Sequence, residues 1–169
     1  MNGALVIAVL VCLASSCKAQ GTQSVSIEEF RGVRFGMTPA EASAAYGAPL
    51  IPLAPLNEDE DACHYLFPDG QIGPLSFMVS SGRVARVDVR SAETLTAEGV
   101  GVGSTEAEVR RAYGELVKAS PHKYTGPEGQ YLTVHPGGDL GIVFETDGFR
   151  VERFRIGRFP EVGWVEGCL

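Results

Sequence analysis

The chain has 169 residues, a formal net charge of −7 at pH 7 and 44% hydrophobic residues. This length accommodates one domain or two small ones, and the composition is that of a globular protein. The acidic balance argues against nucleic acid as a partner, because nucleic-acid binding needs clustered lysines and arginines, which the sequence lacks.

Residues 1–19 are predicted to be an export signal. Residues 4–14 form an apolar run that is too short to cross a bilayer core of about 30 Å and has the length of a signal-peptide apolar region. Leu13-Ala14-Ser15-Ser16-Cys17 resembles a bacterial lipobox, which implies lipidation of Cys17. With Lys18 rather than Asp after the cysteine, that resemblance implies a periplasm-facing outer-membrane lipoprotein. Cleavage after Ala19, giving a secreted or periplasmic protein, is one alternative, and a buried apolar helix or strand is the other.

The mature part is expected to contain one disulfide. Cys12 and Cys17 fall in the signal, which leaves Cys63 and Cys168. An even pair in an oxidising compartment predicts a Cys63–Cys168 bond, with two unrelated buried thiols as the alternative. The spacing of the cysteines and histidines does not match a metal site. Residues 57–61 (Asn-Glu-Asp-Glu-Asp) lack the spaced oxygen ligands of a calcium loop and are expected to be a solvated acidic loop.

An internal repeat organises residues 27–169. The pattern G-V-x-φ-G-x-T-x-A-E-x-x-x-A-Y-G, where φ is apolar, occurs at residues 32–47 and again, in the same register, at residues 99–114. We therefore predict two units, 27–95 and 96–169, after a flexible linker at residues 20–26.

The repeated motif predicts a short capped helix in each unit. In a capping box, a threonine oxygen accepts an early backbone N–H and a glutamate three residues later reaches back to the cap. The two boxes are Thr38 with Glu41 and Thr105 with Glu108. Gly47 and Gly114 end the helices, which are expected at 39–46 and 106–113.

Strand periodicity follows each helix. The predicted strands are residues 62–67, 75–80, 83–89, 130–135, 140–145 and 150–156. Ser81-Gly82 and Asp147-Gly148 are predicted hairpin turns, and switches of parity in the apolar residues predict bulges. The predicted class is α+β: two tandem repeats, each a short helix followed by about three antiparallel strands, with the helices on one face of the sheet.

The repeated motif also resembles a known family signature. Arg34-Phe35-Gly36-Met37-Thr38-x-x-Glu41, ending in Tyr46-Gly47-Ala48-Pro49, is similar to the signature of the BamE (SmpA/OmlA) superfamily. Two such units in tandem resemble the beta-lactamase inhibitor protein (BLIP) family, and the tail 121–168 resembles that of bacterial exported proteins. The resemblance implies an exported protein that acts through protein–protein contact.

No catalytic motif of a known class is present in the sequence. The best catalytic candidate pairs His122 or His135 with Asp139 or Glu145, without support from spacing. We therefore expect a protein that is not an enzyme, has no cofactor and touches membrane only through a lipid anchor. The alternatives are a carbohydrate- or small-ligand-binding protein and, less favoured, a hydrolase.

The expected function is binding of another envelope protein through the free face of the sheet. Aromatic residues and arginines are enriched where binding energy concentrates, with core packing as the alternative for each aromatic residue. The candidate residues are Tyr65, Phe67, Phe77, Arg83, Arg86, Tyr124, Tyr131, Arg150, Arg153 and Trp164.

Overall fold

The computed structural model of this chain describes residues 23–53 and 62–168. Over these residues the protein is α+β, with two sheets, a majority of strands and two short α-helices. A search of this part of the chain finds no helix with the length and apolar character needed to cross a membrane. The predicted export signal with Cys17 and the predicted acidic loop 57–61 lie outside the described residues.

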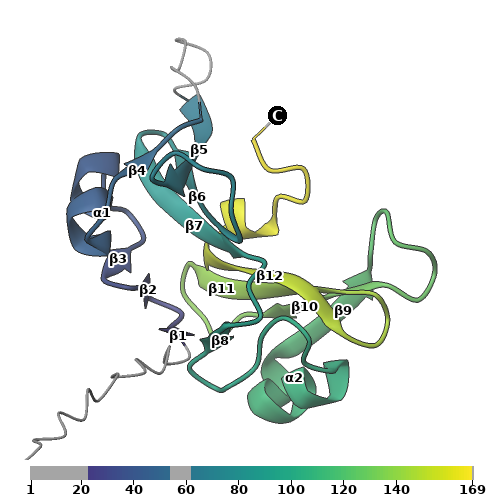
Figure 1. Cartoon of the computed structure of the whole chain (residues 1–169). Helices are drawn as coiled ribbons and strands as arrows, with labels where there is room; N and C mark the ends of the chain where they lie inside the picture. The colour runs from purple at the N-terminus through teal and green to yellow at the C-terminus, as the bar shows by residue number, and fades with distance from the viewer. Residues whose placement is uncertain (1–22, 54–61, 169) are drawn as a thin grey trace, which may run out of the picture.

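The larger sheet is antiparallel and has eight strands (Figure 1). In spatial order they are β4 (Leu50–Ile51), β5 (Cys63–Pro68), β6 (Leu75–Ser80), β7 (Arg83–Val89), β12 (Val151–Arg158), β11 (Leu140–Thr146), β10 (Gln130–Val134) and β9 (Val117–Pro121). The six predicted strands are all present in it, with ends that differ from the prediction by no more than about two residues.

The predicted turns fix the two longest hairpins. Ser81 and Gly82, between β6 and β7, both have positive φ (51° and 72°), which matches the twist of the flanking strands. Between β11 and β12, the Asp147 carboxylate accepts the backbone N–H groups of Phe149 and Arg150 at 2.8 and 2.7 Å. Local side-chain chemistry therefore sets the hairpin positions.

Both hairpins contain the predicted irregularity. The register shifts between Met78 and Val79 in β6, and between Glu145 and Thr146 in β11. The two shifts fall at corresponding positions when the motif at residues 32–47 is aligned with the motif at residues 99–114. Each shift changes which side chains of the hairpin face the core.

Strands β7 and β12 pair at the middle of the sheet and join its halves. Val87 lies opposite Ile156, Asp88 opposite Arg155, and Val89 opposite Phe154. When the motif at residues 32–47 is aligned with that at residues 99–114, Val87 corresponds to Phe154, Asp88 to Arg155 and Val89 to Ile156. Exchanging every residue for its counterpart therefore reproduces the same three pairs. The centre of this sheet is therefore symmetric about the Asp88–Arg155 pair.

The smaller sheet has the order β3 (Val33–Arg34), β2 (Glu29–Phe30), β1 (Gln23–Val25) and β8 (Thr94–Thr96). Strand β1 pairs with β8 in parallel, and Val25 is completely buried. The flexible linker predicted for residues 20–26 is therefore wrong for Gln23–Val25, because strand pairing and burial of Val25 order this segment.

The helices α1 (Pro39–Tyr46) and α2 (Glu106–Tyr113) begin at the two predicted capping boxes. The Glu41 amide donates to the Thr38 hydroxyl at 3.3 Å, and the Glu108 amide donates to Thr105 at 3.2 Å. Each glutamate returns a carboxylate oxygen to the N–H of its threonine. The chain leaves α1 at Gly47, which has a left-handed φ of 79°. A short 3-10 turn, η2 (Gly114–Leu116), follows α2.

We expect Thr38→Ala and Thr105→Ala each to lower the free energy of unfolding by about 1 kcal/mol, the usual loss on removal of a threonine N-cap. Urea denaturation measures this loss. Arg111→Ala, an exposed change within α2, is the control and should alter stability by less than about 0.5 kcal/mol. Threonine variants as stable as the wild type would contradict the capping role.

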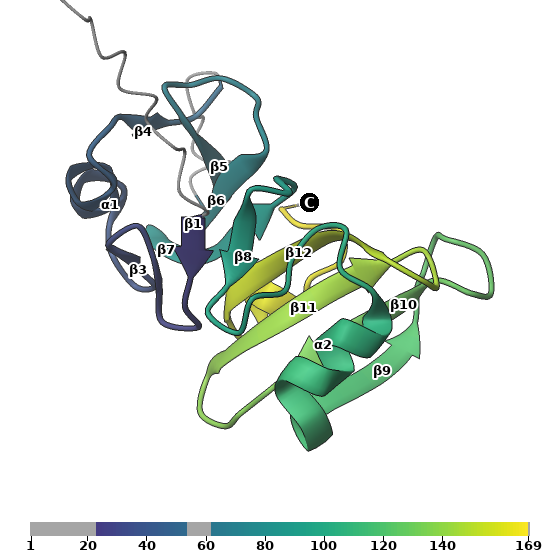
Figure 2. The same ribbon diagram turned by 60° about the horizontal axis from the view of Figure 1, so that its bottom comes forward.

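One continuous core joins the helices and the sheet. Ala42 of α1 and Val109 of α2 are completely buried in the same cluster as Phe77 of β6 and Phe144 of β11. Figure 2 shows α2 lying along the part of the sheet formed by β9, β10 and β11. Burial of each phenylalanine contributes roughly 1.5–3 kcal/mol.

The C-terminal segment, residues 159–168, lies against the other face of the larger sheet. Its short 3-10 helix η3 (Glu161–Gly163) contacts β7, β11 and β12. Val162 packs with Tyr131 and Val143 in a second small cluster. The predicted disulfide is present: Cys63 of β5 is bonded to Cys168, with their Cα atoms 5.4 Å apart. The end of the chain is thus tied across the sheet to β5.

Candidate functional site

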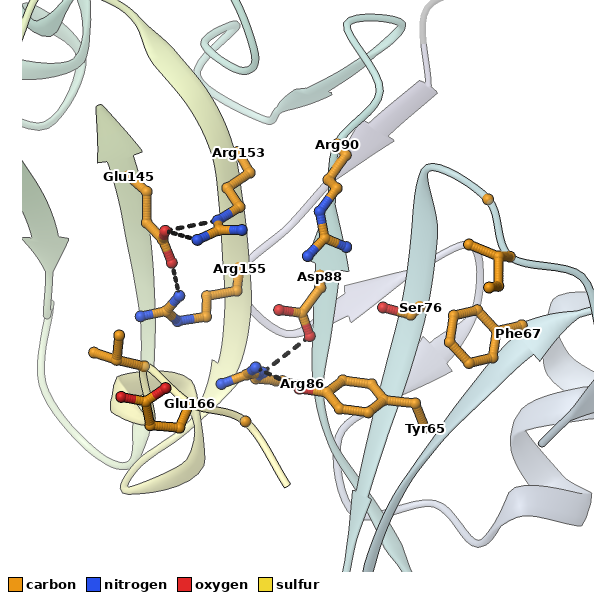
Figure 3. Close-up of a pocket in the computed structure, with 14 residues that line it drawn as sticks. Tyr65, Phe67, Ser76, Arg86, Asp88, Arg90, Glu145, Arg153, Arg155 and Glu166 are labelled. Atoms are coloured by element: carbon orange, nitrogen blue, oxygen red, sulfur yellow. Dashed lines mark hydrogen bonds and ion pairs between the residues drawn. The ribbon is translucent and has the colours of Figure 1, made fainter. Parts of the chain in front are cut away.

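A cavity of about 490 Å³ opens between the larger sheet and the C-terminal segment. Figure 3 shows its walls: β11 and β12 carry Glu145, Arg153 and Arg155, and the other side carries Tyr65 and Phe67 of β5. Strand β7 runs between them. The cavity therefore collects side chains from both halves of the chain.

Alternation along β7 explains the charged floor of the cavity. Successive side chains of a strand point to opposite faces. In Arg86-Val87-Asp88-Val89-Arg90 both valines are completely buried in the main core, and Arg86, Asp88 and Arg90 line the cavity. The charged row therefore lies on the face away from the main core.

Arg86 is buried, with 3% exposure, and its guanidinium group donates to four acceptors. It donates to Asp88 at 2.9 Å, to the Tyr65 hydroxyl at 2.7 Å, and to the backbone carbonyls of Glu161 and Trp164, both at 2.8 Å. A buried guanidinium needs several acceptors to compensate for lost hydration. Arg86 therefore holds the C-terminal segment against the sheet and one wall of the cavity in place.

Tyr65→Phe should lower stability by about 1–2 kcal/mol at pH 8, because Arg86 loses a partially buried acceptor. Burial, followed by the charge of Asp88, raises the pKa of Tyr65. The neutral phenol is thus favoured in the folded state. The neutral phenol therefore stabilises the folded state fully below about pH 10, which is the pKa of tyrosine in an unfolded chain. This stabilisation is lost as the pH rises through the raised pKa of Tyr65.

Urea denaturation of wild type and Tyr65→Phe between pH 8 and 11 measures both effects. Tyr124→Phe is the matched control, because that side chain is 61% exposed. Equal stability of Tyr65→Phe and the control would contradict the role of the hydroxyl.

Glu145 organises the opposite wall. Its side chain is 2% exposed. One oxygen accepts Arg153 Nε at 2.6 Å, and the other accepts Arg155 Nη1. Arg155 also donates to the carbonyl of Val162 at 2.6 Å. Burial on its own raises the pKa of Glu145, but the Arg153 hydrogen bond and the charges of Arg155 and Arg153 outweigh it and lower the pKa overall.

The structure brings together one of the predicted catalytic pairs, His122 and Glu145, at 3.2 Å. The His122 Nδ1 accepts the backbone N–H groups of Tyr124 and Thr125, so the proton lies on Nε2 and points at Glu145. The ring is 4% exposed and stacks on Tyr131 at 4.4 Å. Both ring nitrogens are occupied, and this histidine supports the carboxylate rather than facing the cavity.

Four residues of the predicted binding face meet at the cavity: Tyr65, Phe67, Arg86 and Arg153. Tyr124 and Trp164 are exposed, at 61% and 37%, but do not line it.

The other four predicted residues do not line the cavity. Phe77 is completely buried and contacts Tyr46 at 5.5 Å, because alternation in β6 turns it to the main core. Tyr131 is 7% exposed beneath the C-terminal segment. Arg83 and Arg150 donate to the carbonyls of Gly36 and Gly103, at 2.8 and 2.6 Å, and so brace the loops before the helices. Predicting Phe77 and Tyr131 as part of an exposed binding face was wrong, because both are buried. Arg83 and Arg150 are exposed but lie outside the cavity lining.

The sequence interpretation missed Asp88, Arg90 and Arg155 as members of the site. The signal for the first two was available, because the charged residues of Arg86-Val87-Asp88-Val89-Arg90 alternate with valine. Arg155 reaches the site only because β12 pairs with β7, with Asp88 directly opposite Arg155.

The cavity presents guanidinium N–H donors beside half-buried aromatic rings, and these groups can bind a ligand by hydrogen bonds and apolar packing. Within residues 23–53 and 62–168, no three His, Cys, Asp or Glu side chains cluster closely enough to hold a metal ion. Comparison of the chain with protein-family models, with curated proteins and with solved structures finds no match.

Proposed function

We propose that this chain is a non-enzymatic, exported cell-envelope protein that binds another envelope protein through the cavity-bearing face of its larger sheet. The observation that carries the proposal is the convergence of Tyr65, Phe67 and Arg153 in one open cavity. Tyrosine and arginine are enriched at the points where binding energy concentrates. The adaptor or inhibitor-like role implied by the BamE and BLIP resemblance is consistent with such a face.

The same proposal includes two tandem units, 27–95 and 96–169, with helices on one face and a partner on the other. Recurrent contacts support it. The Arg83–Gly36 bond has its counterpart in the Arg150–Gly103 bond of the second unit. The Tyr46–Phe77 ring contact has its counterpart in Tyr113–Phe144, at 5.5 and 5.9 Å. Recurrence of contacts, and not only of residue types, favours duplication of a structural unit.

We propose that the protein faces the periplasm as an outer-membrane lipoprotein anchored at Cys17, or is secreted or periplasmic without that anchor. Metabolic palmitate labelling that disappears in Cys17→Ala is the expected result. Recovery of an unlabelled soluble protein that begins at Gln20 would contradict the lipid anchor and support secretion without it.

The test of the binding face is site-specific photo-crosslinking in the native envelope. A crosslinker at Ile72, 79% exposed on the cavity rim, should capture a defined protein, identified by mass spectrometry. The same crosslinker at Phe149, 63% exposed and outside the cavity lining, is the control and should not capture it.

Phe67→Ala should then weaken binding of that protein by roughly tenfold or more, and Phe149→Ala by less than about twofold. A partner captured equally at both positions would refute the binding face.

A carbohydrate or small ligand is the second candidate, because the cavity volume falls within the range of about 300–1,000 Å³ typical of ligand pockets. Glycan-array binding that Phe67→Ala abolishes, without a crosslinked protein, would favour it.

A further inference from the structure

The guanidinium groups of the cavity outnumber the carboxylates that face them. Arg86 is paired with Asp88, and Glu145 is shared between Arg153 and Arg155. Arg90 has no hydrogen-bond or ion-pair partner for its side chain among the described residues. Glu166, at the rim, pairs with Lys123 at 2.5 Å. Among the described residues, the cavity therefore has more positive than negative charge, within a chain whose net charge is −7.

Two of the four arginines keep donors for a ligand. Arg86 and Arg155 are almost completely buried and are committed to internal acceptors. The Arg153 side chain is 43% exposed, and its Nε and Nη2 both contact the Glu145 carboxylate. Its Nη1 has no hydrogen-bond partner among the described residues and can donate to a ligand. Arg90, just after β7, is exposed. Planar guanidinium donors match the geometry of a carboxylate.

An apolar ledge adjoins these donors. Phe67 and Ile72 line the same cavity, and Ile72 is 79% exposed. Ile51 of β4 lies directly opposite Phe67 across the strand pair, which puts both on one face, and is 45% exposed. A ligand that reaches Arg90 and Arg153 therefore passes exposed apolar side chains.

We infer that the cavity takes an acidic segment of the partner protein, in which an Asp or Glu side chain stands next to a large apolar residue. The carboxylate meets Arg90 and Arg153, and the apolar residue packs on Phe67 and Ile72. Charge complementarity selects this occupant. Two available guanidinium groups suit one carboxylate, and the net charge of −7 repels an extended polyanion. The inference rests on the proposed function and names its partner chemistry.

The test uses blocked hexapeptides of sequence Gly-Gly-Phe-Glu-Gly-Gly as probes, with NMR shifts of backbone amides and arginine Nε groups as the readout. We expect saturable shifts at Arg90, Arg153 and Phe67 that weaken as salt is added. Peptides with Phe-Gln or Ser-Glu at the centre should bind roughly tenfold more weakly, because each lacks one of the two contacts.

Arg90→Gln should weaken Phe-Glu peptide binding by roughly tenfold without affecting the fold, since its guanidinium has no partner among the described residues. Arg34→Gln, which changes an exposed arginine in the smaller sheet, is the matched control and should leave binding unchanged. Equal binding of the Phe-Glu and Phe-Gln peptides, or insensitivity to Arg90→Gln, would overturn the inference.

Two further outcomes separate this inference from the proposed function. A crosslinked partner that is lost in Phe67→Ala but unaffected by Arg90→Gln and Arg153→Gln would retain the proposed function and refute the acidic segment. Tighter binding of a glucuronate disaccharide than of any peptide would refute both in favour of a carbohydrate ligand.

Discussion

Glu145→Gln is expected to lower the free energy of unfolding at pH 7 by about 3–5 kcal/mol, because it leaves buried positive charge without its partner. Arg155 is 5% exposed and has Glu145 as its ion-pair partner within the described residues. The amide that replaces one carboxylate oxygen adds a donor where guanidinium donors already point. Urea denaturation measures the loss.

The matched control is Arg153→Gln, which breaks an ion pair on the same carboxylate. The Arg153 side chain is 43% exposed, so solvent screens the pair and its loss should cost about 1 kcal/mol or less. Equal losses of unfolding free energy in Glu145→Gln and Arg153→Gln would contradict the claim that leaving Arg155 buried without its ion-pair partner is the main cost.

The cost of Glu145→Gln should depend on pH in a defined direction. The pKa of Glu145 is lowered in the folded protein, so its carboxylate stabilises the fold above the unfolded value of about 4.3. This contribution is lost as the pH falls through the lowered pKa. The stability difference between wild type and variant should therefore be largest near neutral pH and should narrow below about pH 4. A difference that grows on acidification would reverse the assigned sign.

Removal of the Cys63–Cys168 bond by Cys63→Ala and Cys168→Ala together should lower stability by about 2–5 kcal/mol. The bond closes a loop with a sequence separation of 105, which restricts the unfolded chain strongly. Thermal denaturation of the oxidised wild type and the double variant measures the loss. Equal stability would mean that the bond contributes nothing.

Hydrogen exchange should localise the structural effect of that double variant. Arg86 and Arg155 hold the carbonyls of Glu161, Val162 and Trp164 without help from the disulfide. We therefore expect faster exchange in residues 165–168, with η3 still protected. Release of the whole segment 159–168 would show that the disulfide, and not the arginines, keeps it on the sheet.

The sequence alone determined the local elements of this protein. The capping boxes at Thr38 and Thr105 act on backbone groups three residues away, so their effect does not depend on the rest of the fold. Ser81-Gly82 and Asp147-Gly148 likewise fix hairpins through their own turn geometry. The short strands β1, β2, β3, β4 and β8 were missed because two or three residues are too few to display a period. Strand β9 (Val117–Pro121) was also missed, because its sequence Val-Lys-Ala-Ser-Pro shows no apolar alternation.

Only the tertiary structure decided which side chains share a site. A strand pattern tells which residues lie on the same face, but not which strand lies beside it or what covers that face. Pairing of β7 with β12 brought Arg155 opposite Asp88, and the C-terminal segment covered Tyr131 while leaving Phe67 open. These outcomes depend on contacts between residues far apart in the chain, which the local pattern of charge and hydrophobicity does not encode.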